Sequence, residues 1–409
     1  AAQAIFGGIA VKGKLPVSIP TLYTAGTGMF TEKTRLGYHE PEEVGASPER
    51  LDVIASIVED GLEQKAFPGC QVLVAKDGMI IYDKSFGYFD KKNLVIKDLL
   101  YHQSGLTPTI NFYLNAIDRD SYKGSLYSNV KNRAHPVRFD ARTYVRNDFS
   151  FLPGLVSFDR RPGFTTEVAH KMYLHDSFKD TIIQEIKDSR LGVRGKYKYS
   201  CINFILLKMM VEKQMQQPMD RLLHDTFFSR LGAWHMTYNP LHIFDTIQIV
   251  PTEYDGFIRR QLLRGYVHDE AAAFQGGVSG NAGLFSNAGD LAKVLQLYLN
   301  QGHYGGEGYL SKETCRLFTQ SKSPTCRRGL GFDKPVAGGG KASPCGSLAP
   351  ISVYGHTGFT GTCFWVDPDN NLLYIFLSNR VNPTRANNKL SSLNIRTRIQ
   401  DAIYKAINN

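Results

Sequence analysis

The sequence predicts an α+β fold, in which an antiparallel sheet is flanked by helices and accompanied by a mostly helical subdomain. Three observations indicate this. A helix and a β-hairpin open the main part of the chain, a second hairpin and a helix close it, and a long helical and irregular stretch separates them. Strands from the two ends can share one sheet around an inserted middle. We expect an extended tail over residues 1–45 and one domain over 46–409, with the subdomain at about 107–285.

The first helix and hairpin have clear local signals. Ser47-Pro48-Glu49 combines a helix-capping residue, a proline suited to the first turn and an early acidic residue. A hairpin with strands over 70–76 and 79–82 follows, because Asp77-Gly78 between two apolar runs is a strong signal for a two-residue turn.

The later elements are expected from the spacing of apolar residues. Helical stretches are predicted near 166–189 and over 201–213, and Ser286 is expected to cap a helix that ends at Leu299. A second hairpin is predicted over 363–377. In the last 20 residues, a final helix is expected to bury one apolar face made of Leu393, Ile395, Ile399, Ile403 and Ile407.

The composition is ordinary for a globular protein, with 42% hydrophobic and 21% charged residues among 409. No apolar run reaches the ~18 residues that a membrane-spanning helix needs, so no transmembrane segment is predicted. The formal net charge is +10, but the basic residues are scattered and match no nucleic-acid-binding motif, so no nucleic-acid partner is predicted. The six cysteines include no Cys-x-x-Cys pair, which argues against a zinc site, and no cofactor is expected.

The run from Gly355 to Thr362 carries the strongest chemical signal. Its His356-Thr357-Gly358 triplet opens a predicted strand and offers an imidazole, a hydroxyl and exposed backbone N–H groups on one edge. Such an edge can bind an anion or a carbonyl oxygen. The alternative interpretation is a glycine-rich turn with a structural histidine at the start of a strand.

Two further segments complete a recognisable set. They are Leu99-Leu100-Tyr101-His102-Gln103-Ser104-Gly105-Leu106 and Tyr199-Ser200-Cys201. With His356-Thr357-Gly358 they match, in order, the Leu-Leu-x-His-x-Ser-Gly-Leu, Tyr-Ser-Asn and His-Thr-Gly elements of one superfamily. The chain therefore resembles the serine beta-lactamase and penicillin-binding-protein superfamily, in particular its class C-like, esterase-like branch, over roughly residues 46–409. The runs Gly276–Leu284 and Ser378-Asn379-Arg380 also look like this branch.

The resemblance implies a beta-lactamase/transpeptidase-like fold and a serine that is acylated by an ester, an amide or a D-amino-acid peptide. A small or cell-wall-derived substrate would fit, which implies a periplasmic or secreted bacterial protein. By motif position, Tyr199 would be the general base, His356 would act in the opposite wall with Thr357 and Gly358, and the Phe359 N–H would stabilise the oxyanion. Cys201 would contact substrate where asparagine is usual, although a thiol hydrogen-bonds poorly. His102 and Ser104 are expected to brace their loop, and a buried, helix-capping Tyr199 is the alternative to the base.

The nucleophile of this superfamily, a Ser-x-x-Lys turn on a helix, has no counterpart at its expected place. Only residues 91–98 separate the first hairpin from Leu99, and at ~1.5 Å per residue they cannot hold a four-turn helix with its connections. The one match, Ser128-Asn129-Val130-Lys131, comes too late in the chain and is interpreted as chance. Either a segment between Asp90 and Lys91 is missing from this sequence, which we favour, or the protein is a non-catalytic binding module that has lost its serine.

Three smaller patterns need an interpretation. Within the tail, Ala4–Gly8 and Gly13–Ser18 resemble the end of a family-3 glycosidase, which suggests a fusion to a glycosidase module. His268-Asp269-Glu270 could suggest a metal, but adjacent side chains rarely point the same way, so a hydrogen-bonded loop is expected. Glu253 and Asp255 are expected to be solvated or to brace a loop.

Overall fold

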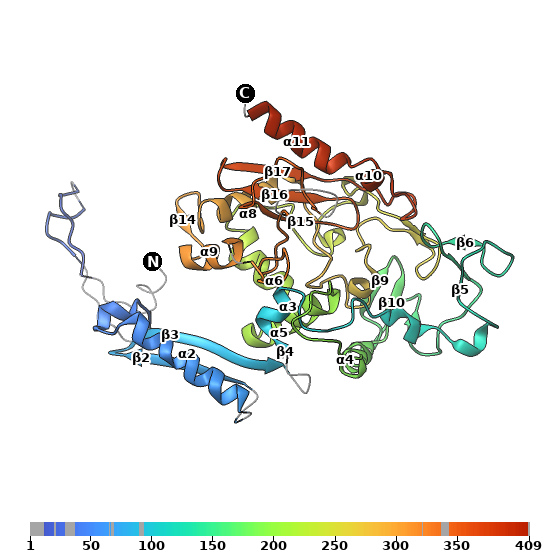
Figure 1. Ribbon diagram of the computed structural model, residues 1–409, viewed down its shortest axis with the longest axis horizontal. Coiled ribbons are helices and arrows are strands. Elements are labelled where there is room, and N and C mark those ends of the chain that lie inside the picture. Colours follow the sequence, from blue (N-terminus) through green and yellow to red (C-terminus); the bar gives the residue numbers. More distant parts are fainter. Residues whose placement is uncertain are drawn as a thin grey trace. The chain divides into compact units, whose positions relative to one another are not determined.

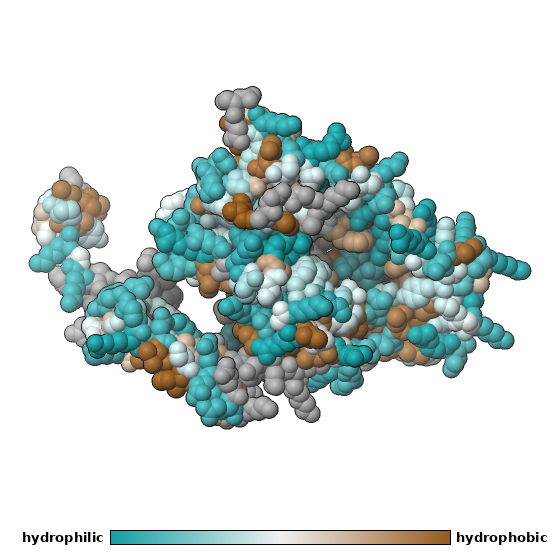
Figure 2. Space-filling view, in the orientation of Figure 1, coloured by the Kyte–Doolittle hydropathy of each residue, from teal (hydrophilic) through white to brown (hydrophobic). Residues whose placement is uncertain are grey.

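The computed structural model describes residues 12–19, 22–28, 37–64, 66, 69–89, 94–320, 322–336 and 343–407. The chain divides into two compact units, Ala1–Val95 and Ile96–Asn409, which are described separately below (Figure 1). Within the described part of the chain, none of the helices combines the length and the apolar character that crossing a bilayer requires. The face seen in Figure 2 is mostly hydrophilic, with hydrophobic residues in small separate groups.

The first unit is built on the predicted helix and hairpin. Helix α2 (Pro48–Glu63) starts as expected, because the Ser47 hydroxyl accepts a hydrogen bond from the Arg50 N–H at 3.3 Å. The hairpin pairs β2 (Gly69–Lys76) with β3 (Met79–Phe89). Its turn residues Asp77 and Gly78 have φ of 53° and 70°, the left-handed conformation that a tight two-residue turn of this kind requires.

The tail predicted over residues 1–45 contributes to this unit. Strand β1 (Gly37–Tyr38) pairs in parallel with β3, and the short helix η1 (Pro41–Val44) follows it. Strand β4 (Leu94–Val95) pairs with the end of β3. Ile19 and Tyr23 form a single antiparallel bridge in the tail, whereas Ala4–Gly8 lies outside the described residues.

The second unit contains the predicted C-terminal hairpin in a three-stranded antiparallel sheet. Its strands are β15 (Tyr354–Thr357), β16 (Cys363–Asp367) and β17 (Leu372–Phe376), in that order. Side chains alternate between its faces: Tyr354 and Val366 pack with Leu295 of helix α8 (Ala288–Leu299). Trp365 packs on the opposite face, in a cluster that includes Ile403 of helix α11 (Ile395–Ile407). Figure 1 shows the two helices on opposite sides of the sheet. Whether both hairpins join in one sheet stays a prediction.

Two details of these helices differ from expectation. Helix α8 is capped by Asn287, one residue after Ser286, and its side chain accepts from the Asp290 N–H at 2.8 Å. The predicted inward face of α11 is wrong for Leu393, Ile399 and Ile407, which are exposed. The buried residues are Gln400 and Tyr404, because the Gln400 side chain accepts from the Gly346 N–H and the Tyr404 hydroxyl donates to Asp367. Polar anchors of this kind leave no apolar periodicity in the sequence.

The middle of the chain, inside the second unit, mixes helices with short strands. The helix predicted near 166–189 begins only at Phe178, because β9 (Thr166–Ala169) and β10 (Met172–Leu174) pair as a hairpin before it. The helix predicted over 201–213 is confirmed as α5. Besides α2, α8 and α11, the described α-helices are α3 (Ile96–Leu100), α4 (Phe178–Asp188), α5 (Cys201–Met215), α6 (Met219–Leu223), α7 (Glu270–Ala273), α9 (Lys312–Gln320) and α10 (Lys389–Ser392).

The remaining elements are short. The strands are β5 (Tyr127–Ser128), β6 (Val137–Arg138), β7 (Tyr144–Val145), β8 (Val156–Ser157), β11 (Tyr254–Asp255), β12 (Gln261–Leu262), β13 (His303–Tyr304) and β14 (Glu307–Gly308). The helical turns are η3 (Phe112–Ala116), η4 (Arg119–Ser121), η5 (His224–Phe228), η6 (Pro240–His242) and η7 (Thr246–Gln248).

Candidate active site

Tyr199 is held against the loop that carries His102. Ser200, the buried residue that opens α5, donates its backbone N–H to His102 Nδ1 at 3.1 Å and its hydroxyl to the Thr107 carbonyl at 2.6 Å. His102 has a φ of 57°, a left-handed conformation. Its ring stacks on the Tyr199 ring with centroids 4.3 Å apart. The structure therefore brings together two segments separated by about a hundred residues of sequence.

The bracing predicted for the 102–106 loop has a clear structural basis. The Ser104 hydroxyl donates to the Asn203 side-chain oxygen at 2.6 Å, inside the core. The Asn203 amide donates to His102 Nδ1 at 3.2 Å. Burial and the charge of Arg328 together lower the pKa of His102 to about 3, so this imidazole stays neutral and serves as an acceptor.

His356 lies on β15 and faces Tyr199, with 6.3 Å between the two ring centroids. Its Nδ1 donates to the Thr357 carbonyl at 2.8 Å, and its Nε2 accepts from Arg328 Nη1 at 2.9 Å. These partners define the tautomer with the proton on Nδ1. Burial lowers the pKa of His356, and so does the charge of Arg328, so the imidazole is neutral.

Arg328 is a site residue that the sequence did not single out. Only 5% exposed, it donates to His356 and lies 3.3 Å from a carboxylate oxygen of Asp333. Its guanidinium carbon also lies 5.2 Å from the ring centroid of Tyr199. Arg328 stands in a loop, 28 residues before His356 in the chain. In the sequence it belongs to one of several scattered pairs of basic residues, so its place in the site becomes visible only in the folded chain.

The side chains of Tyr199 and Cys201 are both uncharged at neutral pH. Burial raises the pKa of Tyr199 to about 12, and Arg328 only partly opposes this. Burial and the nearby Asp269 raise the pKa of Cys201 to about 11. A thiol that keeps its proton is a poor nucleophile. A phenol with this pKa needs a closer cation before it can act as a base.

The loop after β15 presents the predicted oxyanion donor. The Gly358 N–H donates to the Thr362 carbonyl at 2.7 Å, and a Cβ at Gly358 would overlap the Thr362 hydroxyl. A side chain at this position would therefore displace the Thr362 hydroxyl, and glycine avoids that contact. The next amide, that of Phe359, donates to no acceptor among the residues that the structure describes, so it is available to a substrate oxygen.

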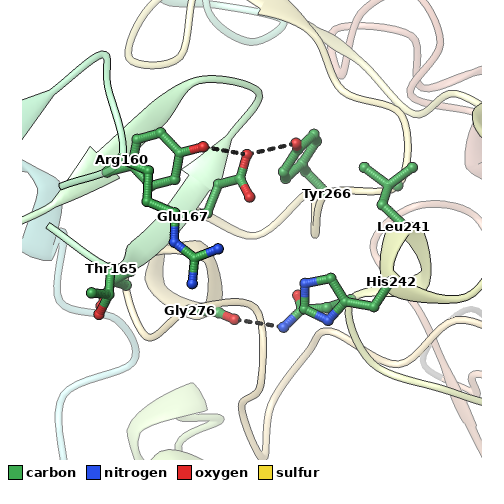
Figure 3. A pocket seen from close by; sticks show the side chains of 11 residues that line it. Arg160, Thr165, Glu167, Leu241, His242, Tyr266 and Gly276 are labelled. Atoms are coloured by element: carbon green, nitrogen blue, oxygen red, sulfur yellow. Dashed lines mark hydrogen bonds between the residues drawn. The ribbon is translucent and has the colours of Figure 1, made fainter.

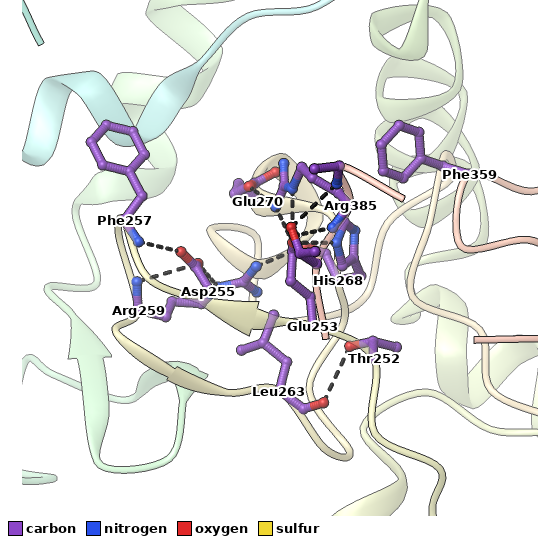
Figure 4. Close-up of polar contacts among 12 residues, drawn as sticks. Thr252, Glu253, Asp255, Phe257, Arg259, Leu263, His268, Glu270, Phe359 and Arg385 are labelled. Carbon is purple, nitrogen blue, oxygen red and sulfur yellow. Dashed lines mark hydrogen bonds and ion pairs between the residues drawn. The ribbon is translucent and has the colours of Figure 1, made fainter. Parts of the chain in front are cut away.

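A buried ionic network lies next to Phe359 (Figure 4). Glu253 is not solvated: one of its oxygens is 2.7 Å from His268 Nε2 and 2.7 Å from Arg385 Nε. Burial raises the pKa of Glu253, but these two partners outweigh it and hold the pKa below its ordinary value. The neighbouring Asp255 forms a buried pair with Arg259 at 2.8 Å. Both acids therefore brace loops, which is one of the two interpretations that the sequence left open.

The remaining sequence patterns have plain structural explanations. In the 268–270 run, His268 contacts Glu253, Asp269 caps α7 and Glu270 pairs with Arg385, so the three side chains serve different partners. Ser128 belongs to the two-residue strand β5, and its hydroxyl donates to the Val130 carbonyl at 2.8 Å. Ser128 and Lys131 therefore do not share a helix face. The junction at Asp90–Lys91 lies outside the described residues.

The fold and the motifs together define a protein of the serine beta-lactamase type. The family model described as "Beta-lactamase" matches residues 88–395, and the chain belongs to this family. It is 31% identical over 376 residues to a "Putative D-alanyl-D-alanine carboxypeptidase" of Escherichia coli (strain K12), with 83% of this chain and 84% of the relative covered. A relative of the same name from Salmonella agona is 30% identical over 387 residues, with 86% and 87% covered.

Among solved structures, the chain is similar to an octameric penicillin-binding protein homologue from Pyrococcus abyssi. That comparison has a TM-score of 0.42 and 14% sequence identity, and it covers 85% of this chain and 78% of the other.

Proposed function

We propose that this protein is a serine hydrolase that cleaves a peptide ending in a D-amino acid through an acyl-enzyme, as a D-alanyl-D-alanine carboxypeptidase does. The observation that carries the proposal is the buried contact between Arg328 and His356, beside Tyr199. A guanidinium next to a neutral imidazole suits the terminal carboxylate of a peptide, which would accept charge-assisted hydrogen bonds there. The names of the two bacterial relatives support the same substrate class.

Each named residue has a role in this proposal. The Phe359 N–H binds the carbonyl oxygen as it becomes negatively charged, and Gly358 lets the backbone approach the substrate. Thr357 and His356 line the wall that holds the substrate, and Cys201 contacts it from the opposite side. Tyr199 accepts the serine proton. Because histidine and cysteine replace residues that line the antibiotic site in lactamases, peptidase or esterase activity is favoured over lactam hydrolysis.

The proposal requires a nucleophile segment that this sequence does not contain. The comparison with the E. coli K12 relative extends over 376 residues, whereas 83% of a 409-residue chain is about 340. About 36 positions of the relative therefore lack a counterpart, enough for a four-turn helix with its connections. A lysine on such a helix would also supply the cation that the Tyr199 phenol needs. Both points support a segment missing from within the chain, and the order of the motifs is what favours Asp90–Lys91 as its place.

The alternative is a binding module that keeps the cleft and has lost its serine. The absence of Ser-x-x-Lys at its expected place favours this alternative. Labelling of the full-length gene product with a fluorescent penicillin or a fluorophosphonate distinguishes the two. We expect labelling and a gene that encodes Ser-x-x-Lys across this junction. No labelling, together with a gene that encodes no Ser-x-x-Lys there, would establish the binding module instead.

We also propose that residues 1–45 derive from the end of a glycosidase module fused to this domain. The support is the sequence of Ala4–Gly8 and Gly13–Ser18, and strand β1 shows that this segment reaches the sheet of the first unit. The gene sequence upstream of Ala1 tests this: an open reading frame that continues into a glycosidase domain is expected, and an unrelated upstream sequence would contradict it.

A further inference from the structure

A polar cavity of about 310 Å³ lies in the second unit and shares no residue with the candidate active site. It is bounded by the β9–β10 hairpin on one side and by the loops around 239–242 and 265–276 on the other (Figure 3). Its volume is at the lower end of the range for ligand sites, about 300–1,000 Å³, which suits a small molecule. None of the residues that line it belongs to the three motifs discussed above.

One wall of this cavity is a carboxylate that is only half satisfied. The hydroxyls of Tyr266 and Tyr173 both donate to the same oxygen of Glu167, at 2.9 and 3.5 Å. The second oxygen receives no hydrogen bond from any residue that the structure describes, and Figure 3 shows it turned into the cavity. Burial and Glu167 raise the pKa of Tyr266, so this phenol keeps its proton and remains a donor.

The opposite charge reaches the same cavity from Arg160. Figure 3 shows its guanidinium extending towards the centre, below Glu167. Among the described residues, no carboxylate lies within ion-pairing distance of it, Glu167 included. Arginine is always charged and presents a fork of donors that matches a carboxylate. Two opposite charges therefore face one cavity without neutralising each other.

We propose that this cavity binds a small zwitterion, namely a free amino acid or a dipeptide. Its ammonium group would donate to the free oxygen of Glu167, and its carboxylate would accept from Arg160. Leu241 and Gly265 form an apolar part of the lining that suits a short side chain. The Asn239 amide donates one N–H to the Gly276 carbonyl at 2.9 Å, which fixes the side chain in the lining of the cavity. The proposal does not depend on the hydrolase function.

Calorimetric titration of the full-length protein with D-alanine and with D-alanyl-D-alanine tests the proposal. N-acetyl-D-alanine and D-alaninamide each lack one of the two charges. We expect saturable binding of the zwitterions, with each singly charged analogue about tenfold or more weaker. The zwitterion that binds more tightly shows whether the site takes an amino acid or a dipeptide. Equal binding of the N-acetylated compound, or preference for neutral N-acetylglucosamine, would overturn the proposal.

Variants place the binding in this cavity. Arg160→Ala and Glu167→Gln should each weaken binding about tenfold, because each removes one charge-assisted partner. Arg161→Ala is the matched control: its guanidinium lies 4.5 Å from the Phe164 ring and lines no part of the cavity, so binding should be unchanged. Arg328→Ala, in the candidate active site, should leave the Arg160-dependent binding of D-alanine unchanged, although it should weaken any separate binding of the dipeptide in the active-site cleft.

Loss of binding in Arg328→Ala with retention in Arg160→Ala would place the ligand in the active-site cleft and overturn the proposal. Thermal unfolding of each variant checks its fold. If Glu167→Gln is destabilised, the exposed Arg160 still provides the test, because its side chain makes no hydrogen bond or ion pair within the described part of the chain.

Discussion

The imidazole of His268 stacks on the ring of Phe359, with centroids 5.5 Å apart and planes 27° apart. Arg380 lies 4.8 Å from the same ring and donates its Nε to the Phe359 carbonyl at 2.9 Å. His268 is itself fixed by the buried Glu253. The residue whose amide is proposed to bind the oxyanion is therefore anchored through its ring and its carbonyl, although Phe359 as a whole is 60% exposed.

We expect His268→Ala to slow acylation by a labelled penicillin about tenfold, because a less constrained Phe359 amide stabilises the oxyanion less well. The measurement is the acylation rate of the full-length gene product. His303→Ala, at an exposed position of β13, is the control and should leave the rate unchanged. An unchanged rate in His268→Ala would mean that the stacking does not support the oxyanion site.

The buried pair of Asp255 and Arg259 predicts a large loss of stability when it is broken. Arg259 also donates to the carbonyls of Val267 and His268 at 2.7 Å each, so it ties the loop before α7 to β11. Asp255→Ala should lower the free energy of unfolding by about 3–5 kcal/mol, because it leaves a buried guanidinium without its counter-ion. Glu307→Ala, which breaks an exposed pair with Arg230, should cost less than about 1 kcal/mol. Urea unfolding measures both, and equal losses would contradict the assignment.

The same acids predict how stability depends on pH. Burial raises the pKa of Asp255, but Arg259 and two backbone N–H groups outweigh it, so the pKa lies below the ordinary 3.8. The pKa of Glu253 likewise lies below its ordinary 4.5. Acids with a lowered pKa in the folded state stabilise it above their ordinary pKa, and this stabilisation is lost as pH falls through the folded pKa. The free energy of unfolding, measured between neutral pH and pH ~3, should fall steeply at the acid end of this range. In Glu253→Gln this fall should be less steep. An equally steep fall in that variant would exclude Glu253 as a source of the pH dependence.

The sequence predicted those parts of the fold that depend on local signals. The Ser47 cap, the Asp77-Gly78 turn and the hairpin over 363–377 are present because neighbouring residues alone determine them. The inward face of α11 was wrong because its buried positions are held by polar bonds of Gln400 and Tyr404 to distant residues. The hairpin at 166–174 was missed because its register depends on pairing with β8, which periodicity does not reveal.

The residues of the candidate site also fall into those that the sequence predicted and those that only the folded chain shows. Tyr199 and His356 were found because they belong to short motifs, and the structure places their rings 6.3 Å apart. Arg328 belongs to no motif, and its importance rests on a contact with His356 that only the folded chain creates. Glu167 and Arg160 were missed for the same reason, since they meet only across the cavity.

Replacing Tyr199 with phenylalanine should lower turnover ~100-fold or more in the full-length gene product, because it removes the proposed proton acceptor and keeps the ring that stacks on His102. Tyr197→Phe is a matched control, because Tyr197 also contacts Arg328, at 3.3 Å, but lies outside the motif. Steady-state hydrolysis of a D-alanyl-D-alanine peptide measures both variants. Unchanged turnover in Tyr199→Phe would remove Tyr199 from the mechanism.

The role proposed for Arg328 predicts a split between binding and chemistry. Arg328→Ala should raise KM about tenfold or more for a peptide with a free terminal carboxylate, because it removes the guanidinium that would bind this group. The same change should have little effect on KM for the corresponding carboxamide, which offers no charge to bind. Arg328→Lys keeps the charge but not the fork of donors, so it should restore binding only in part. Arg327→Ala is the control, because Arg327 pairs with the same Asp333 at 2.7 Å but does not contact His356. This variant shows how much of a rise in KM comes from a loosened Asp333 and how much from loss of the guanidinium that would bind the substrate carboxylate. A KM that rises equally for the acid and the amide would mean that Arg328 positions His356 and does not bind the substrate carboxylate.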